Sequence, residues 1–311
     1  MLVSDKFLFK NHVALMKIAR DIMVTDIGSR LPAITDFSNR FNISRGTIQM
    51  ALNFLSEEKA ITLVKRGQQG STLLSKDSEI LWQYTGWGVL FGGMPLPLHG
   101  LVAGLATGVC ECMKSNSINY NCVFLQGSLT RIKALLNKKI DFIVASKLTA
   151  MTIFEQYQGI EQVIEMPNVD YSGRYVLLFS PNNKELKREM VIAVDPTSID
   201  QNYITNILCN EFNLNKKEMT YINTYKSTQK GETDLTVARL DVVENEYNNM
   251  YYSDIPEQYF DYKIEELNKT IIFAEKENYG LKQLLQKVIN PINVERVQEK
   301  VINKLIPPQY Y

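Results

Sequence analysis

Histidine and cysteine are scarce in this sequence. The chain has only two histidines among its 311 residues, and no Cys-x-x-Cys pair. The four cysteines are Cys110, Cys112, Cys122 and Cys209. Zinc sites need several such side chains at close spacing, so we expect no metal site, and unpaired thiols are typical of a reducing compartment. The sequence also lacks a P-loop and a nucleophile with a suggestively placed histidine, so we assign no catalytic residue and expect no cofactor.

Net charge is also absent. Lys plus Arg and Asp plus Glu both total 34, which excludes a strong basic field over the whole chain. Residues 1–80 have a small excess of basic side chains, 11 against 8 acidic ones. This asymmetry gives weak support to a nucleic-acid-facing N-terminal region.

Long apolar runs are missing as well. The most membrane-like stretch, residues 86–113, is interrupted by Pro95, Pro97 and His99. Neither half approaches the roughly 18–20 apolar residues that a membrane span needs. The N-terminal residues mix charges into their apolar positions, unlike a signal peptide. We therefore expect no membrane association and a cytoplasmic location.

The length and the hydrophobic pattern predict two domains. A chain of 311 residues exceeds the usual size of one compact core. Before residue 80 the apolar spacing is helical and ends in a hairpin, whereas after it short apolar strands alternate with helices. We place one domain at 1–78 and a second at 79–311.

Three helices and a hairpin are predicted in the first domain. The helices are expected at about 9–24, 35–42 and 45–58, and the paired strands at 61–64 and 71–74. Thr35 is the expected N-cap of the second helix, with Asp36 in its first turn, and Ser44 is the expected N-cap of the third. This succession is the layout of a winged helix-turn-helix domain.

The third helix and the hairpin have the side chains that DNA reading requires. The first turn of such a helix needs polar groups for bases and phosphates, and the wing needs glycines and cations near the DNA backbone. The candidate DNA-contacting residues are Thr35, Ser44, Arg45, Thr47, Gln49, Lys65, Arg66, Gly67 and Gln68. Any one piece alone is better explained as a capped surface helix or an ordinary hairpin, but their ordered combination favours DNA binding.

Residues 28–74 resemble the DNA-binding domain of GntR-type regulators. The matching residues are Leu31, Pro32, Ile43, Ser44, Arg45, Thr47, Ala51, Leu52, Leu55, Lys65, Arg66, Gly67 and Gly70. Two positions depart from that family's pattern. Ala33-Ile34-Thr35 replaces a Ser-Glu-Arg run, and Gln49 stands where a basic residue is common. We expect fewer phosphate contacts as a consequence, and Gln49 would suit adenine.

The second domain is predicted to be α/β. Strand–helix alternation indicates mainly parallel sheets, arranged in two lobes with a cleft between them. The expected strands include the runs around 89–97, 119–128, 141–148, 174–180, 190–195, 219–227, 233–241 and 269–277. Gly100, Gly104 and Gly108 stand four apart on one predicted helix, where we expect close packing on the sheet.

Ligands of parallel α/β sheets bind beyond the carboxyl ends of the strands. The residues predicted to bind a ligand on this basis are Met94, Pro95, Leu96, Pro97, Gly127, Ser128, Ser146, Lys147, Asp195, Ser198 and Tyr225. Gly127 and Ser128 open a helix and suit a carboxylate or a phosphate, and Lys147 would add a cation, so an anionic effector is a candidate. For each residue alone an ordinary strand-end loop is the alternative.

This organisation resembles the type 2 periplasmic-binding-protein fold. Together with the winged helix-turn-helix domain at 1–78, which we call the head, it resembles the YhfZ-type regulators. The residues that carry the second resemblance are Met94, Pro95, Leu96, Pro97, Gly104, Leu105, Ala106, Gly108, Arg131, Ile132, Ala134, Leu135, Leu136, Ser146, Leu148, Ala150, Gly173 and Tyr175. The resemblance implies a cytoplasmic transcription regulator with a small-molecule pocket, and it supplies no ligand.

We therefore expect a ligand-responsive regulator that binds a double-stranded DNA operator. A homodimer is expected because two heads on a two-fold operator supply the required half-site spacing. Two alternatives stay open from the sequence: a small-metabolite-binding protein or enzyme with a winged head that does not bind DNA, and a scaffold that uses the head for protein contacts.

Overall fold

The computed structural model describes residues 3–65, 71–98, 100–153, 156–171, 173–260 and 268–310. Its contacts divide the chain into two compact units. The first comprises Met1–Leu90, Met113–Asn119 and Tyr279–Val288, and the second comprises Phe91–Cys112, Tyr120–Asn278 and Ile289–Tyr311. Helix α11 (Tyr279–Val288) therefore packs with the N-terminal elements although it lies near the end of the chain.

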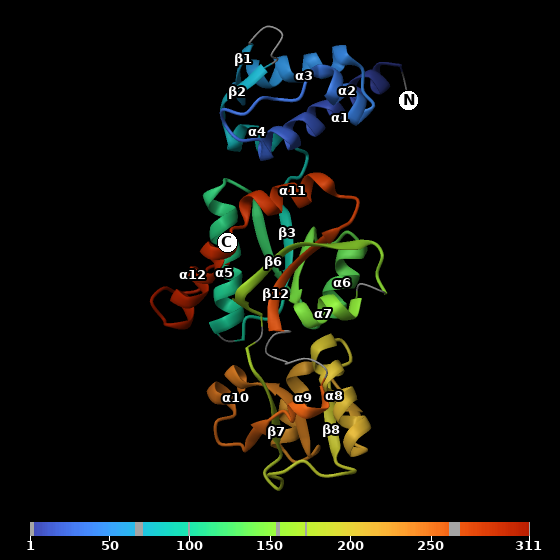
Figure 1. The fold of residues 1–311 in the computed structure, drawn as a ribbon, viewed down its shortest axis with the longest axis vertical. Helices are drawn as coiled ribbons and strands as arrows, with labels where there is room; N and C mark the ends of the chain where they lie inside the picture. The colour runs from blue at the N-terminus through green and yellow to red at the C-terminus, as the bar shows by residue number, and fades with distance from the viewer. Residues whose placement is uncertain are drawn as a thin grey trace. The chain divides into compact units, whose positions relative to one another are not determined.

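The first unit has the predicted helices and hairpin (Figure 1). Its elements are α1 (Val3–Val24), α2 (Ile34–Phe41), α3 (Arg45–Glu57), β1 (Ile61–Lys65), β2 (Ser71–Lys76) and α4 (Ser78–Tyr84). Their core is built from apolar residues at helical spacing, including Ile18, Phe37, Ile48 and Leu55, which are fully buried. The layout predicted for this region is confirmed.

A third extended segment joins the hairpin. Strands β1 and β2 are antiparallel, and the segment at Gly28–Leu31 lies beside β2. The Gly28 and Leu31 backbone N–H groups donate to the carbonyls of Leu73 and Ser71, at 2.7 and 2.9 Å. Pairing on this side anchors the hairpin to the connection between α1 and α2.

The second unit contains two five-stranded sheets, which we call lobe I and lobe II. Lobe I has the strand order β4-β3-β5-β12-β6, from β3 (Leu90–Met94), β4 (Tyr120–Phe124), β5 (Phe142–Ser146), β6 (Ile160–Asp170) and β12 (Lys269–Glu275). Strands β3 and β5 are parallel, whereas β12 is antiparallel to both of its neighbours. The sheet is mixed, not mainly parallel, because the chain returns from lobe II and adds β12 in the opposite direction.

Lobe II has the strand order β11-β7-β10-β8-β9. The strands are β7 (Tyr175–Phe179), β8 (Val191–Val194), β9 (Asn215–Glu218), β10 (Leu235–Arg239) and β11 (Tyr252–Asp254). Residues of β7 alternate between two cores: Leu177 and Phe179 pack with α8 (Ile199–Phe212), and Val176 and Leu178 pack with α9 (Tyr221–Gln229) and α10 (Leu240–Glu246). Burial on both faces explains the uninterrupted apolar run in β7.

Four further helices accompany lobe I: α5 (Gly100–Ser115), α6 (Ser128–Leu136), α7 (Lys147–Ile153) and α12 (Pro291–Ile302). Helices α6 and α7 share a core with β5 and β12. The glycines of α5 do pack closely, but against a helix and not against the sheet as predicted. A Cβ on Gly104 or Gly108 would lie 2.8 Å from Gln298 Cα or 2.9 Å from Val294 Cα of α12.

The segment 219–227 is helical in α9, so the predicted strand there is wrong. Its β-favouring Thr and Tyr residues suggested a strand, but Tyr221, Tyr225 and Thr228 are buried on one face at helical spacing. The Asp195 carboxylate also accepts a hydrogen bond from the Tyr221 N–H at 3.1 Å and stabilises the start of the helix. Among the described residues, no helix combines the length and hydropathy needed to cross a bilayer.

Candidate functional site

The outward face of α3 is the candidate DNA-reading surface. Ile48, Leu52 and Leu55 are buried in the core of the head, which leaves Arg45 and Met50 exposed on the opposite side of the helix. The first turns of this side have polar or flexible side chains, as contacts with bases and phosphates require, and the aromatic Phe54 is exposed further along the helix. Burial of the apolar face of α3 therefore keeps the opposite face of the helix exposed to solvent.

Local hydrogen bonds arrange that face. Ser44 is the N-cap of α3, as predicted, and accepts a hydrogen bond from the Thr47 N–H at 3.3 Å. The hydroxyls of Ser44 and Thr47 lie 2.8 Å apart. Gln49 donates from its amide to the Asn53 side-chain oxygen at 2.8 Å, which orients both amides on neighbouring turns. Asn53 was not among the predicted residues.

Two other predictions for the head have different outcomes. Thr35 is not the N-cap of α2, because the helix begins at Ile34 and Ala33 occupies the cap position. Asp36 lies in the first turn, as expected, and accepts a hydrogen bond from the Ala33 N–H at 3.0 Å. Lys65 is the last residue of β1, whereas Arg66, Gly67 and Gln68 lie outside the described residues.

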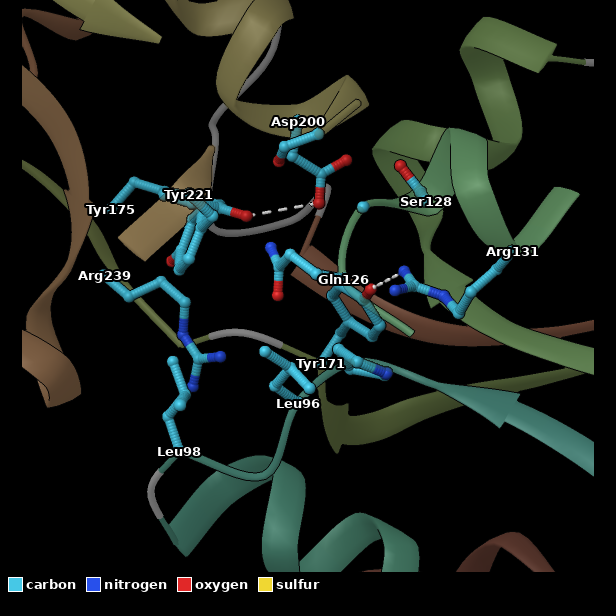
Figure 2. Close-up of a pocket in the computed structure, with 13 residues that line it drawn as sticks. Leu96, Leu98, Gln126, Ser128, Arg131, Tyr171, Tyr175, Asp200, Tyr221 and Arg239 are labelled. Atoms are coloured by element: carbon cyan, nitrogen blue, oxygen red, sulfur yellow. Dashed lines mark hydrogen bonds between the residues drawn. The ribbon is translucent and has the colours of Figure 1, made fainter. Parts of the chain in front are cut away.

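A cavity in the second unit is the candidate ligand site (Figure 2). Its lining comes from both lobes and from the segment that connects them. The lining residues are Pro95, Leu96, Leu98, Gln126, Gly127, Ser128, Arg131, Tyr171, Tyr175, Ser198, Asp200, Tyr221 and Arg239. The space between them is narrow, about 40 Å³, which holds only a few water molecules.

Arg131 is a buried guanidinium in the lining, with 1% of its surface exposed. It lies on α6, donates to the Leu125 carbonyl at 2.7 Å and also donates to the Tyr171 hydroxyl. Its Nε hydrogen has no acceptor among the described residues. The positive charge of Arg131 acts on Asp200 in the same lining, where it opposes the rise in the pKa of that carboxyl, but the described residues contain no direct ion pair between the two. Burial raises the pKa of Tyr171 to about 12, so its hydroxyl stays protonated.

Asp200 is a buried carboxylate at the start of α8, and its hydrogen bonds come from hydroxyl groups. Ser146 and Thr149 of lobe I donate to Oδ1 at 2.7 and 2.9 Å, and Tyr175 donates to Oδ2 at 3.2 Å. Burial raises the pKa of Asp200 above its ordinary value, and these three hydrogen bonds oppose that shift. Asp200 therefore joins lobe II to lobe I.

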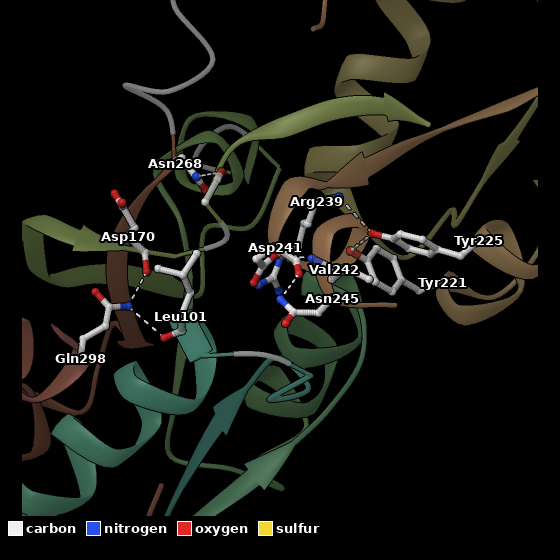
Figure 3. A network of polar contacts seen from close by, with 11 residues as sticks. Leu101, Asp170, Tyr221, Tyr225, Arg239, Asp241, Val242, Asn245, Asn268 and Gln298 are labelled. Atoms are coloured by element: carbon white, nitrogen blue, oxygen red, sulfur yellow. Dashed lines mark hydrogen bonds and ion pairs between the residues drawn. The ribbon is translucent and has the colours of Figure 1, made fainter. Parts of the chain in front are cut away.

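Arg239 is the second guanidinium in the lining, and it has its own counter-ion. At the end of β10 it binds Asp241 in a bidentate pair, with Nε 3.1 Å from Oδ1 and Nη2 2.5 Å from Oδ2 (Figure 3). Its backbone N–H donates to the Tyr225 hydroxyl at 3.0 Å. Asp241 also accepts from the Val242 N–H, so both charges are held by the fold.

The two lobes contact each other beside the cavity. The Leu129 N–H donates to the Thr197 carbonyl at 3.1 Å, and the Ile199 N–H donates to the Ser128 hydroxyl at 3.2 Å. Gly127 allows this approach, because it has a φ of +79° and a Cβ there would lie 2.1 Å from the Thr197 hydroxyl. The starts of α6 and α8 thus meet directly.

Five of the predicted ligand residues line the cavity: Pro95, Leu96, Gly127, Ser128 and Ser198. The others lie elsewhere, each with its own structural contacts. Met94 is buried at the end of β3, and Pro97 lines a separate groove beside residues 301–310. Ser146 donates to Asp200, Tyr225 accepts from the Arg239 N–H, and Lys147 forms an exposed ion pair with Glu165. Asp195 is buried and accepts hydrogen bonds from the Thr197 and Tyr221 N–H groups.

Sequence reasoning missed Arg131, Asp200 and Arg239. Arg239 lies near the end of the predicted strand at 233–241 and ends the observed β10, so the strand-end rule applied there would have found it. Arg131 stands four residues before the buried Leu135, which places a charge on the buried face of its helix. Asp200 had no signal, because an acidic residue in the first turn of a helix is ordinary.

Comparison with known proteins agrees with this architecture. A model of the YhfZ C-terminal domain matches residues 77–310, which is most of the chain. The chain belongs to the YhfZ family. A model of a helix-turn-helix domain matches residues 26–73. A YhfZ relative from Escherichia coli (strain K12), described as an uncharacterized protein, is 25% identical over 305 residues, which are 98% of this chain and 99% of that protein.

Solved structures show the same fold. The crystal structure of YhfZ from Shigella flexneri matches with a TM-score of 0.60 and 21% identity, over 75% of this chain and 98% of that one. An ancestral arginine-binding protein bound to arginine matches with a TM-score of 0.51 and 12% identity, over 70% of this chain and 97% of that one. The predicted fold class is confirmed: a helix-turn-helix region precedes a periplasmic-binding-protein-like α/β domain. The two matched domains support a DNA-binding regulator.

Proposed function

We propose that this YhfZ-family chain is a ligand-responsive transcription regulator of GntR-like type. It acts in the cytoplasm as a homodimer on a two-fold DNA operator, with α3 in the major groove and the wing on the backbone. A small-molecule effector binds in the cavity between lobes I and II. The division at about residue 78 separates the DNA-binding part from the effector-binding part.

The observation that carries this proposal is the pairing of two features in one chain. One is the Ser44-capped α3, whose apolar face is buried and whose polar face is open to solvent. The other is a cavity lined by charged groups from two lobes. A ligand with different affinity for open and closed lobes shifts the equilibrium between them, which couples the cavity to the heads.

We infer that the cavity binds its ligand without turnover. Its charged groups are arranged for binding: Arg239 is paired with Asp241, and Asp200 is held by hydroxyls. Burial raises the pKa of Tyr171 and of Tyr221, so neither phenol acts as a base near neutral pH.

The direct test is fluorescence anisotropy of the full chain with DNA from upstream of its own gene. We expect tighter binding to this DNA than to a shuffled duplex of equal length, and a log-linear loss of affinity with added salt. Arg45→Gln should weaken binding and reduce the salt slope by about one. Arg296→Gln is the matched control, because this exposed arginine of α12 lies 3.9 Å from Glu111 and outside the head.

Binding without any preference for the upstream DNA would contradict the regulator. It would favour the alternative of a metabolite-binding protein or enzyme whose winged head does not bind DNA. Sedimentation of the protein with and without DNA tests the homodimer. A thermal-shift screen tests the effector, because a ligand at 100 times its dissociation constant adds about 2.7 kcal/mol of stability.

A further inference from the structure

The charged groups of the cavity differ in how many of their donor or acceptor positions have a hydrogen-bond partner. An ionised carboxylate accepts about four hydrogen bonds, and Asp200 receives three from hydroxyls at 2.7–3.2 Å. Arg239 has the bidentate geometry with Asp241 that neutralises a guanidinium. The protein itself therefore supplies a counter-ion for Arg239 and three of about four hydrogen bonds for Asp200.

Arg131 is not satisfied in this way. Its acceptors are a backbone carbonyl and a phenol, both uncharged, and its Nε hydrogen has no acceptor in the described part of the chain. Asp200 in the same lining interacts with this charge but forms no direct ion pair with it in the described ranges. A buried charge without a directly paired carboxylate, and a buried donor without an acceptor, are both costly. In a residue that lines a cavity, both deficits point to an anionic partner from outside the protein.

Two more donors and the start of a helix line the same cavity. Tyr171 accepts from Arg131, and its own proton has no acceptor among the described residues. Figure 2 shows the Gln126 amide directed into the cavity, and this side chain has no hydrogen-bond partner in the described ranges. Helix α6, nine residues long, begins at Ser128 in the lining and adds the positive end of its dipole.

We propose that the effector of this cavity is a small carboxylate and that Arg131 is its anchor. The inference rests on the proposed function, because it names the class of molecule to which the regulator responds. A guanidinium and a carboxylate are both planar and match in a bidentate pair. The Asp200 carboxyl in the same lining disfavours a phosphate dianion more than a carboxylate monoanion, and the narrow space selects a ligand of few heavy atoms.

The test uses the full-length protein and calorimetric titration with acetate, pyruvate, phosphate, methylamine and glycine at matched ionic strength. We expect acetate or pyruvate to bind, and phosphate and methylamine not to bind. Absence of binding by both carboxylates overturns the inference, as does tighter binding of phosphate. Glycine carries a carboxylate and an amine, so glycine binding that disappears in Arg131→Gln supports the inference, whereas glycine binding that survives in Arg131→Gln and disappears in Asp200→Asn overturns it.

Substitutions identify the anchor. Arg131→Gln should lower carboxylate affinity by about thirty-fold or more, because it removes one partner of a buried charge pair. Lys147→Gln is the control, because this cation lies outside the cavity and pairs with Glu165 at 3.1 Å; its affinity should be unchanged. Unchanged affinity in Arg131→Gln overturns the inference.

If circular dichroism shows that Arg131→Gln does not fold, Arg131→Lys and Tyr171→Phe decide instead. The first keeps the charge without the planar fork, and the second removes one donor, so both should weaken binding; undiminished binding in both overturns the inference. Upstream-DNA binding without carboxylate binding contradicts this inference alone. Carboxylate binding without any preference for the upstream DNA contradicts the regulator alone.

Discussion

Side-chain hydrogen bonds on α3 join residues three or four apart, whereas those of the Asp200 carboxylate in the cavity join residues 25 to 54 apart. Ser44 with Thr47, and Gln49 with Asn53, are exposed pairs on one helix. Asp200 bonds to Tyr175, Thr149 and Ser146, at separations of 25, 51 and 54 residues, and all of these bonds are wholly or partly buried.

The two regions therefore differ in how strongly a substitution that changes binding also changes the stability of the fold. An exposed local pair contributes a few tenths of a kcal/mol, so a residue on the reading face can change with little effect on the fold. A buried charge that loses its partner costs several kcal/mol, so a cavity residue affects both binding and folding. Substitutions in the two regions test this contrast.

The largest effect is expected at the cavity. Asp241→Ala leaves the Arg239 guanidinium, 7% exposed, without its counter-ion. We expect a loss of about 3–5 kcal/mol in the free energy of unfolding, measured by urea denaturation. Asp241→Asn keeps the size of the side chain and one acceptor, and it should cost less. A loss below about 1 kcal/mol in Asp241→Ala would show that the pair is not structural.

The second-largest effect is expected at Gly108 of α5, and Gly46 of α3 is the glycine to which we compare it. Gly108→Ala places a Cβ 2.9 Å from Val294 Cα, so α5 and α12 must separate, and we expect a cost of about 1–3 kcal/mol. Gly46→Ala on α3 meets nothing within 4 Å and should stabilise by up to about 1 kcal/mol. Denaturation curves of the two variants should therefore shift in opposite directions. Equal shifts would contradict the close helix contact.

A smaller effect is expected at the cap of α3. Ser44→Ala removes the acceptor for the Thr47 N–H and should cost about 1 kcal/mol in thermal unfolding. Ser56→Ala is the control on the same helix, because the Ser56 hydroxyl only donates back to the Leu52 carbonyl at 2.9 Å. It should be close to neutral. Equal losses in both variants would argue against the cap.

The last prediction concerns how stability changes with pH. Burial raises the pKa of Asp200 in the folded state, so its stabilising contribution is present below the unfolded pKa of about 3.9 and is lost as pH rises through the folded pKa. Asp200→Asn does not titrate. The variant should therefore gain stability relative to the parent as pH rises from the acidic range to neutrality, in denaturation series at fixed salt. A constant difference would show that this pKa is not raised.

The elements of the head could be predicted because their signals are local. Ser44 as a cap, and Ile48, Leu52 and Leu55 as the buried face, follow from spacing along one helix. The cap of α2 was placed at Thr35 and not at Ala33, because Ala33 offers no side chain to recognise. The segment 219–227 was predicted as a strand because the contact that starts α9 comes from Asp195, more than twenty residues earlier.

Strand ends located part of the cavity, including Pro95, Gly127 and Ser198, because the ends of parallel strands gather at one edge of a sheet. The same rule also selected Lys147 and Asp195. Lys147 pairs with Glu165 outside the cavity lining, and Asp195 accepts a hydrogen bond from the Tyr221 N–H at the start of α9. Position along the chain shows that a residue follows a strand. It does not show whether another residue of the fold already forms an ion pair or hydrogen bonds with that side chain.

The sequence by itself determined the order of the domains, the helical face of α3 and the α/β character of the second domain, because these depend on residues within a few turns of one another. Only the tertiary structure decided which charges are paired. Gln298 illustrates this in the same domain: its amide donates to the carbonyls of Leu101 and Asp170, 197 and 128 residues away (Figure 3). In the same way the Nε hydrogen of Arg131 finds no acceptor in the described part of the chain, although Asp200 lies in the same lining, because pairing depends on distance and orientation in space and not on position along the chain.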